Sequence, residues 1–218
     1  MKKFFNLVAL VAISLLFVQC EQNSSSQGLG KHKGHEYVDL GLPSGLKWAT
    51  CNVGATTPEE YGDYFAWGEV EPKDDYSWEI YKYGTEDNLT KYNSSDGKLI
   101  LDAEDDAAIV NWGGKWRMPT TEEQQELLNN CTWDWTTQNG VYGCKVIGPN
   151  GNSIFLPAAG YMDEGTLDFA GLGGAYWSSS FDTSNSNNAY YVYFFTSDDL
   201  DYDRDLRYYG ITVRPVCE

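Results

Sequence analysis

Histidine is scarce in this chain of 218 residues, which holds only two, His32 and His35. Both lie near the N-terminus, so we expect neither a histidine-based catalytic triad nor a histidine zinc site inside the folded domain. The chain also lacks a glycine-rich phosphate loop and a His-Glu-x-x-His motif. The common hydrolase, metalloprotease and nucleotide-binding patterns are therefore absent from the sequence.

Basic residues are also few. Lysine and arginine number 15 against 32 aspartates and glutamates, which gives a formal net charge of −17. A chain this acidic is repelled by nucleic acid and by anionic membrane surfaces, so we expect no nucleic-acid partner. Solubility is the ordinary use of such a charge, and cation binding is the alternative.

Long apolar runs are absent after the N-terminal segment. In that segment Lys2 and Lys3 precede an apolar run over residues 7–18, which is typical of a signal peptide and shorter than the ~20 residues of a membrane span. Cys20 follows and resembles the lipidated cysteine of bacterial lipoproteins, although Gln19 departs from the small residue usual before it. We expect residues 1–19 to be a signal peptide and Cys20 to carry lipid. The alternative is an ordinary secreted protein with a chance cysteine.

A chain exported in this way would be attached to the outer membrane by its lipid anchor only. It could face either side of that membrane, and one of these sides is the cell surface. Residues 20–34 are rich in Ser, Gly and Gln, which predicts a flexible tether. The remaining residues, 35–218, fit a single domain.

Local signals predict an α+β fold of short antiparallel strands, two or three short helices and long loops. The clearest helix start is at Thr120, a candidate N-cap that follows Pro119 and is completed by Glu123 in a capping box. Two further short helices are expected at 57–61 and 104–112, the second capped by Asp102. Residues 71–98 have no clear periodicity and predict a long surface loop. Alternating segments predict strands at 36–40, 45–49, 131–136, 141–147, 153–156, 175–180, 188–196 and 210–216.

Several stretches carry a resemblance to known families. Residues 116–123, Trp-Arg-Met-Pro-Thr-Thr-Glu-Glu, resemble a segment of the formylglycine-generating enzymes (sulfatase-modifying factors). Together with residues 37–49, 156–161, 176–180 and 213–216, they are more similar to the Fibrobacter succinogenes major paralogous domain family of Bacteroidetes lipoproteins. This resemblance implies a C-type lectin-like fold in which the first and last strands pair. It implies no particular function.

The cysteines after Cys20 allow three disulfide connectivities. Cys131 and Cys144 lie on neighbouring strands of the expected meander and are candidates to pair, as are Cys51 and Cys217 near the ends of the domain. Four free, buried cysteines are the alternative. Formylglycine-generating chemistry needs a reactive cysteine pair near the C-terminal end of the domain, and residues 176–213 contain no cysteine. We therefore do not expect an enzyme.

Aromatic residues are abundant, with eight tryptophans and 16 tyrosines. Flat rings stack on sugars, but aromatic residues in alternating or motif positions are more often core. We expect a core role for Trp48, Trp67, Trp112, Trp116 and Trp177. The candidates for ligand binding are those in the long loop and near the C-terminus, namely Trp78, Tyr81, Tyr83, Tyr202, Tyr208 and Tyr209.

One acidic run, with Asp201, Asp203 and Asp205 at alternate positions, resembles the start of a calcium-binding loop. Leu206 stands where an EF-hand has its glycine, so the run is not an EF-hand. A solvated loop is the ordinary interpretation, and a calcium site is the alternative. No other cofactor is expected.

The sequence thus predicts a non-catalytic recognition module of the cell envelope, for glycan or protein ligands. A structural part of an adhesin or fimbrial tip is the alternative, and it predicts an exposed edge strand that accepts a strand from an envelope protein. An enzyme of the formylglycine-generating type is the second alternative.

Overall fold

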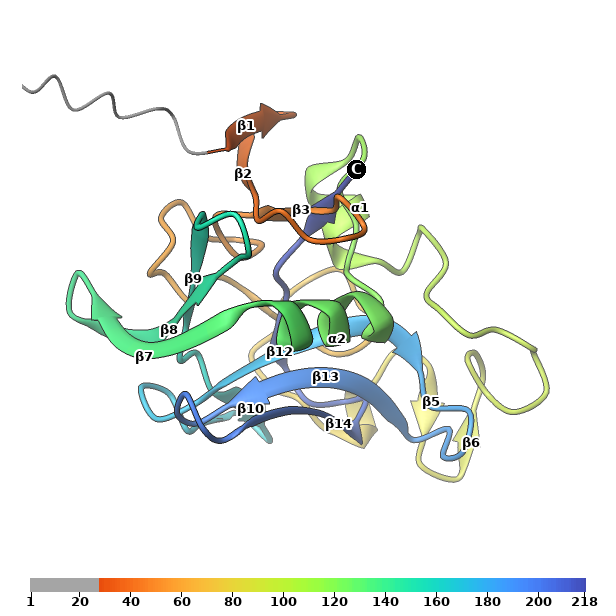
Figure 1. Cartoon of the computed structure of the whole chain (residues 1–218). Helices are drawn as coiled ribbons and strands as arrows, with labels where there is room; N and C mark the ends of the chain where they lie inside the picture. The colour runs from red at the N-terminus through yellow and green to blue at the C-terminus, as the bar shows by residue number, and fades with distance from the viewer. Residues whose placement is uncertain (1–27) are drawn as a thin grey trace, which may run out of the picture.

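The computed structural model describes residues 28–218. The expected signal peptide and Cys20 lie outside the described residues. The chain forms an α+β fold that is mostly β-sheet, with two α-helices (Figure 1). None of the helices in residues 28–218 is long and apolar enough to span a membrane.

The strands form three larger sheets and two short pairs. The largest has the order β14-β13-β12-β15-β4 and comprises β4 (Tyr64–Phe65), β12 (Gly174–Phe181), β13 (Asn188–Phe194), β14 (Leu200–Leu206) and β15 (Ile211–Thr212). The second has the order β1-β2-β3-β16 and comprises β1 (Leu29–His32), β2 (His35–Asp39), β3 (Lys47–Ala49) and β16 (Val216–Cys217). The third is a meander of β7 (Thr132–Gln138), β8 (Val141–Ile147) and β9 (Ser153–Pro157). The pairs are β5 (Gly84–Thr85) with β6 (Asn88–Leu89), and β10 (Tyr161–Asp163) with β11 (Thr166–Asp168).

Helix α2 (Thr121–Asn130) begins at the predicted capping box. The Thr120 side chain accepts a hydrogen bond from the backbone N–H of Glu123, and the Glu123 carboxylate accepts one from the N–H of Thr120 at 2.8 Å. Buried Gln124 donates to the carbonyl oxygens of Tyr176 and Trp177 in β12. These bonds hold α2 against one face of the largest sheet (Figure 1). The opposite face of the sheet is not covered by α2.

The expected meander is confirmed. Asn139 and Gly140 have positive φ values of 50° and 86°, which form the tight turn between β7 and β8. The expected loop over 71–98 is also mostly irregular, with only the 3₁₀ turn Trp78–Ile80 and the short pair β5–β6.

Two helix predictions differ from the structure. Residues 57–61 form a turn, because the Glu60 carboxylate accepts the N–H groups of Thr56 and Thr57. Helix α1 (Ala107–Trp112) is shorter than expected, and its N-cap is Asp106. The Asp106 carboxylate also accepts the N–H of Met118, which joins α1 to the segment before α2.

The ends of the domain also differ from the predictions. The expected tether includes β1, which pairs with β2, so the ordered domain begins before residue 35. The expected last strand is split into β15 and β16, which belong to different sheets. β16 pairs with β3 rather than with the first strand, because β1 already occupies the other edge of β2.

Neither expected disulfide is present. The register sets Cys144 opposite Trp135, four residues from Cys131, and sets Cys217 opposite Lys47, four residues from Cys51. Four strand residues span roughly 13 Å, whereas a disulfide needs Cα atoms within about 7 Å. All four cysteines are free.

Two fully buried arginines join the segments of the interior. Arg214 donates to the side chain of Asn52 and to the carbonyl oxygens of Ala49, Thr50 and Phe155. Arg207 donates to the Tyr81 hydroxyl and to the carbonyl oxygens of Tyr92, Ser186 and Lys91. The expected core tryptophans pack in this interior, with Trp112 only partly buried.

Candidate functional site

Half of the tryptophan and tyrosine candidates for ligand binding are structural. Tyr81, Tyr83 and Tyr208 are only 5%, 6% and 8% exposed. Tyr81 and Tyr83 donate their hydroxyls to the carbonyl oxygens of Trp67 and Gly68, and burial raises the pKa of both phenols. The long loop folds back on Arg207, so Tyr81 and Tyr83 point inward and are not surface ligand sites.

Trp78, Tyr208 and Tyr209 belong to a larger group of rings on the side of the largest sheet away from α2. The rings contact one another in a continuous chain, with centroid separations between 4.8 and 6.1 Å. All except Tyr208 are at least partly exposed. We call this group the aromatic band, and its members are Trp78, Tyr161, Phe169, Tyr191, Tyr193, Phe195, Tyr208 and Tyr209.

Strand alternation explains three of the eight rings of the band. Tyr191, Tyr193 and Phe195 are two residues apart along and just beyond β13, so their side chains share one face. Val192 and Phe194, between them, are buried on the α2 side. This alternation was visible in the sequence, although sequence reasoning did not single out these three rings. Tyr161 and Phe169 had no such signal, because the β10–β11 pair brings them to this face.

A carboxylate lies across the ladder from each of two rings. In the β13–β14 register Asp201 is opposite Tyr193 and Asp203 is opposite Tyr191. Directly opposite residues in an antiparallel pair have neighbouring side chains on the same face. The band therefore presents aromatic faces and carboxylate acceptors side by side, repeated along the strand.

The acidic run itself is a strand and not the expected loop. Asp201, Asp203 and Asp205 lie on β14, and each carboxylate accepts a hydrogen bond from the N–H of the following residue, at 2.8, 2.9 and 2.8 Å. We call these three residues the aspartate row. Alternate residues of a strand are about 6.6 Å apart, so the row is spread along β14 rather than gathered around one calcium ion.

Close acidic side chains occur elsewhere in residues 28–218, at Asp102, Glu104 and Asp105. Lys91 lies among them, with its ammonium 2.7 Å from Asp102 and 3.2 Å from Glu104. Lys82 also pairs with Asp105 at 3.0 Å. Together with Lys98, which lies 2.7 Å from Asp102, these lysines balance the three carboxylates, so the group is a salt-bridge network.

Where Tyr161 and Tyr209 meet in the middle of the band, two carboxylates, Asp163 and Asp205, lie beside their rings. Burial raises the pKa of Asp205, and the nearby charges of Asp203 and Asp163 act in the same direction. Burial also raises the pKa of Tyr161 and Tyr209, which lie beside these carboxylates. Asp163 Oδ1 is buried and has no hydrogen-bond partner among the described residues. This part of the band therefore offers the partly exposed Asp205 as an acceptor to a ligand that can donate hydrogen bonds, whereas the buried Asp163 Oδ1 is closed to a ligand.

Tyr202 faces the other side of the sheet and belongs to a separate groove between α2 and β14. Two adjoining hollows of about 520 and 510 Å³ share Tyr202 and Gln125. Tyr202 is 41% exposed, and Leu99 and Ile100 are also exposed at the second hollow. Tyr202 and the aromatic band are thus on opposite faces of β14.

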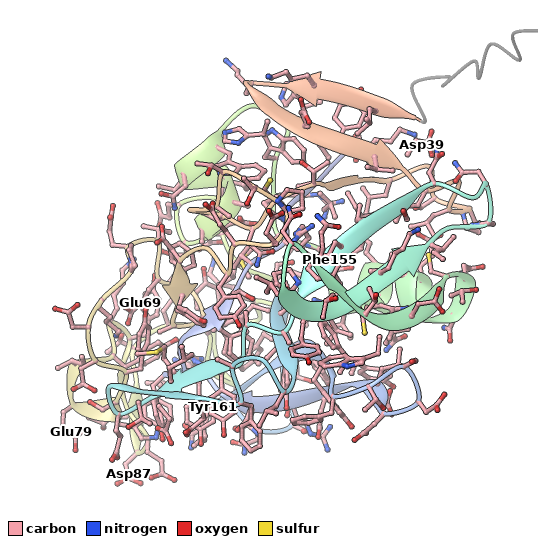
Figure 2. All side chains as sticks on the ribbon, turned by 90° about the vertical axis from the view of Figure 1, so that its left-hand side faces the viewer. Asp39, Glu69, Glu79, Asp87, Phe155 and Tyr161 are labelled. Carbon is pink, nitrogen blue, oxygen red and sulfur yellow. The ribbon has the colours of Figure 1, made fainter. Side chains whose placement is uncertain are left out.

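The aromatic band lies far from the N-terminal hairpin. β1 and the C-terminus are at the top of Figure 1, whereas β10, β13 and β14 are at its lower end. Figure 2 gives the same arrangement from the side, with Tyr161 near the lower rim and the β1–β2 hairpin at the top. Comparison with protein-family models, curated sequences and solved structures gave no match.

Proposed function

We propose that this protein is a lipid-anchored, non-catalytic recognition module of the cell envelope that binds glycan on the aromatic band. The observation that carries the proposal is the pairing of partly exposed rings with carboxylates along β13 and β14. Binding sites for small ligands combine aromatic surface with a few fixed polar groups, and the band has both. The lectin-like fold and the family resemblance are part of this proposal.

The charge of the band favours a neutral glycan. Its ionisable groups are tyrosines and carboxylates, and Arg204 of β14 is on the opposite face. Carboxylates accept strong hydrogen bonds from hydroxyl groups, but they repel sulfate, sialic acid and uronic acid. Because the aspartate row is fixed by the backbone N–H groups, each carboxylate keeps its place beside a ring without a ligand.

The position of the band also suits a tethered receptor. A lipid at Cys20 would attach the chain near β1, and the band is at the opposite end of the domain (Figures 1 and 2). The band would then face away from the membrane.

Two of the four described cysteines, Cys144 and Cys217, support a non-catalytic function. Formylglycine-generating chemistry requires an accessible thiolate. Cys144 and Cys217 are buried, and burial raises the pKa of Cys144 to about 12 and raises that of Cys217 as well. Both thiols are therefore protonated at neutral pH.

Assembly with another protein through a donated strand is the second candidate, because β14 is an edge strand of seven residues. The aspartate row argues against it, since three N–H groups that a donated strand would use already donate to carboxylates. Charged side chains at a sheet edge also discourage pairing. The glycan proposal is therefore the better supported.

The test is a binding panel of neutral glucan, mannan, galactan and xylan, each also in a carboxymethylated form. We expect the purified full chain to bind at least one neutral polymer, to bind its carboxymethylated form more weakly, and to bind equally in calcium and in chelator. Failure to bind any polymer would refute the glycan proposal. Stronger binding to the carboxymethylated form would refute only the charge argument.

Two matched variants locate the site. Tyr193→Ala removes a ring from the band, and Tyr202→Ala removes a more exposed ring from the opposite face. Loss of one stacked ring weakens binding by ~1–3 kcal/mol, by analogy with ring stacking on nucleic-acid bases, so we expect Tyr193→Ala to reduce affinity about tenfold or more. Tyr202→Ala should leave affinity unchanged. Equal losses would contradict the assignment of the band.

A further inference from the structure

The free edge of β14 is built in an unusual way. β14 pairs with β13 on one side only, as the outermost strand of its sheet (Figure 1). In an antiparallel ladder alternate residues direct their N–H and C=O groups toward the partner strand, and the others direct theirs away. The N–H groups of Tyr202, Arg204 and Leu206 are the ones that donate to side chains. These donors therefore belong to the free edge.

The aspartate row covers these donors. Each Asp side chain turns along the strand and accepts the N–H of the next residue, so that the Asp-x-Asp-x-Asp pattern saturates three successive edge donors. Exposed edges are ready templates for pairing with another chain. Here the donors are occupied, and the groups that occupy them carry negative charge.

Apart from the aspartates, the edge is complementary to itself. If two β14 strands paired antiparallel about Asp203, Leu200 would lie opposite Leu206, and Tyr202 opposite Arg204, in both halves of the pair. The even-numbered residues, whose edge groups are free of β13, would form the hydrogen-bonded pairs of this register. An aromatic ring opposite an arginine and a leucine opposite a leucine are both favourable cross-strand pairs.

The aspartates make this pairing of two β14 strands unfavourable. In the same register Asp201 lies opposite Asp205, and Asp203 lies opposite its own counterpart in a non-hydrogen-bonded pair, where side chains are closest. Six carboxylates would then line one face of the joined sheet. Like charges directly opposite one another destabilise a strand pair.

We propose that the aspartate row holds the β14 edge closed, and that a second copy of this chain pairs with β14 once these carboxylates lose their charge. The partner is a second copy because only the aspartates oppose the self-complementary register. The inference shares Asp201 and Asp203 with the proposed glycan site, but it concerns the edge and is tested by oligomeric state, so glycan binding does not decide it.

The experiment measures molar mass by light scattering on the purified full chain and its variants. Asp201→Asn, Asp203→Asn and Asp205→Asn are combined to remove the charge and keep an acceptor. A second combined variant with threonine at the same positions also removes the charge, and it exchanges each carboxylate for a shorter hydroxyl on a β-branched side chain that favours strands. We expect the parent chain to be monomeric and both combined variants to form dimers at neutral pH, the threonine variant at the lower concentration.

The matched control neutralises three exposed acids away from β14, with the substitutions Glu71→Gln, Glu86→Gln and Asp87→Asn. It makes the same change in net charge and should stay monomeric. A dimeric control, or monomeric asparagine and threonine variants that keep the circular dichroism spectrum of the parent, would overturn the proposal.

A proline at the edge locates the contact. The N–H of Tyr202 faces away from β13, so Tyr202→Pro removes an edge donor without removing a β13–β14 ladder bond, and proline is tolerated at such edge positions. Added to the asparagine variant, Tyr202→Pro should restore the monomer while the far-ultraviolet spectrum stays unchanged. A dimer that persists would place the contact elsewhere and contradict the proposal.

Discussion

Replacement of Arg214 by methionine should destabilise the protein more than any surface change. Arg214 is 1% exposed, and no carboxylate in residues 28–218 forms an ion pair with it. Its guanidinium donates to the Asn52 side chain at 2.8 Å and to the carbonyl oxygens of Thr50, Ala49 and Phe155 at 2.9–3.0 Å. These bonds join the segment after β3 and strand β9 to the C-terminal segment.

The magnitude follows from opposing terms. Hydrogen bonds from a charged donor contribute about 1.5–3 kcal/mol each, whereas burial of the guanidinium costs several kcal/mol. Burial accordingly lowers the pKa of Arg214. Methionine removes the burial cost but leaves the Asn52, Ala49, Thr50 and Phe155 oxygens without their donor, at about 1–3 kcal/mol each. We expect a net loss of about 3–5 kcal/mol in the free energy of unfolding. The whole free energy of unfolding of a domain is typically about 5–15 kcal/mol, so this loss is a large fraction of it.

Urea denaturation followed by tryptophan fluorescence measures this loss, and Lys145→Met is the matched control. Lys145 is an exposed lysine on β8 that forms no ion pair with the described residues, so its replacement should change the free energy of unfolding by less than about 0.5 kcal/mol. A loss below about 1 kcal/mol for Arg214→Met would refute the view that Arg214 joins these segments.

Three further predictions concern single side chains. Thr120→Ala removes the N-cap of α2 and should cost about 1 kcal/mol in urea denaturation, whereas Thr120→Ser should cost little; equal costs would contradict the capping role. Burial, and then Lys31, lower the pKa of His35, so the unfolded state binds the proton more tightly. Stability should therefore fall as the pH drops below ~6.5, the pKa of histidine in the unfolded chain. Thermal unfolding at pH 7 and pH 5 checks this, and the melting temperature of His35→Phe should fall less between the two pH values than that of the parent chain. Burial raises the pKa of Asp205, so its charge opposes folding at neutral pH; Asp205→Asn should raise the melting temperature at pH 7, and a lower one would refute the argument.

The parts of the fold that could be predicted carry local signals. The capping box at Thr120 and the turn at Asn139-Gly140 each lie within a few residues, and both are confirmed. Strand β2 was predicted from its alternation, but β1 was not, because its four residues, Leu-Gly-Lys-His, have no apolar alternation. β1 is held by contacts far along the chain, where the indole N–H of Trp116 donates to the carbonyl oxygen of His32 at 3.0 Å.

The candidate site was only partly predictable for a similar reason. The acidic composition of residues 198–205 favoured a loop, and it masked the alternation of Leu200, Tyr202 and Leu206 that marks an edge strand. Tyr81 and Tyr83 were expected at the surface, but Arg207 draws their loop inward through bonds that no local pattern shows. The disulfide predictions were wrong because pairing depends on register, which places each cysteine four residues from its expected partner.

The central claim is that the aromatic band binds a neutral glycan. The most direct test titrates the full chain, Tyr193→Ala and Tyr202→Ala with the neutral polysaccharide that binds best in the panel. The account predicts that Tyr193→Ala loses about tenfold or more in affinity, at ~1.4 kcal/mol per tenfold, while Tyr202→Ala matches the parent chain. Binding that depends on Tyr202 and not on Tyr193 would move the site to the groove beside α2 and contradict the account.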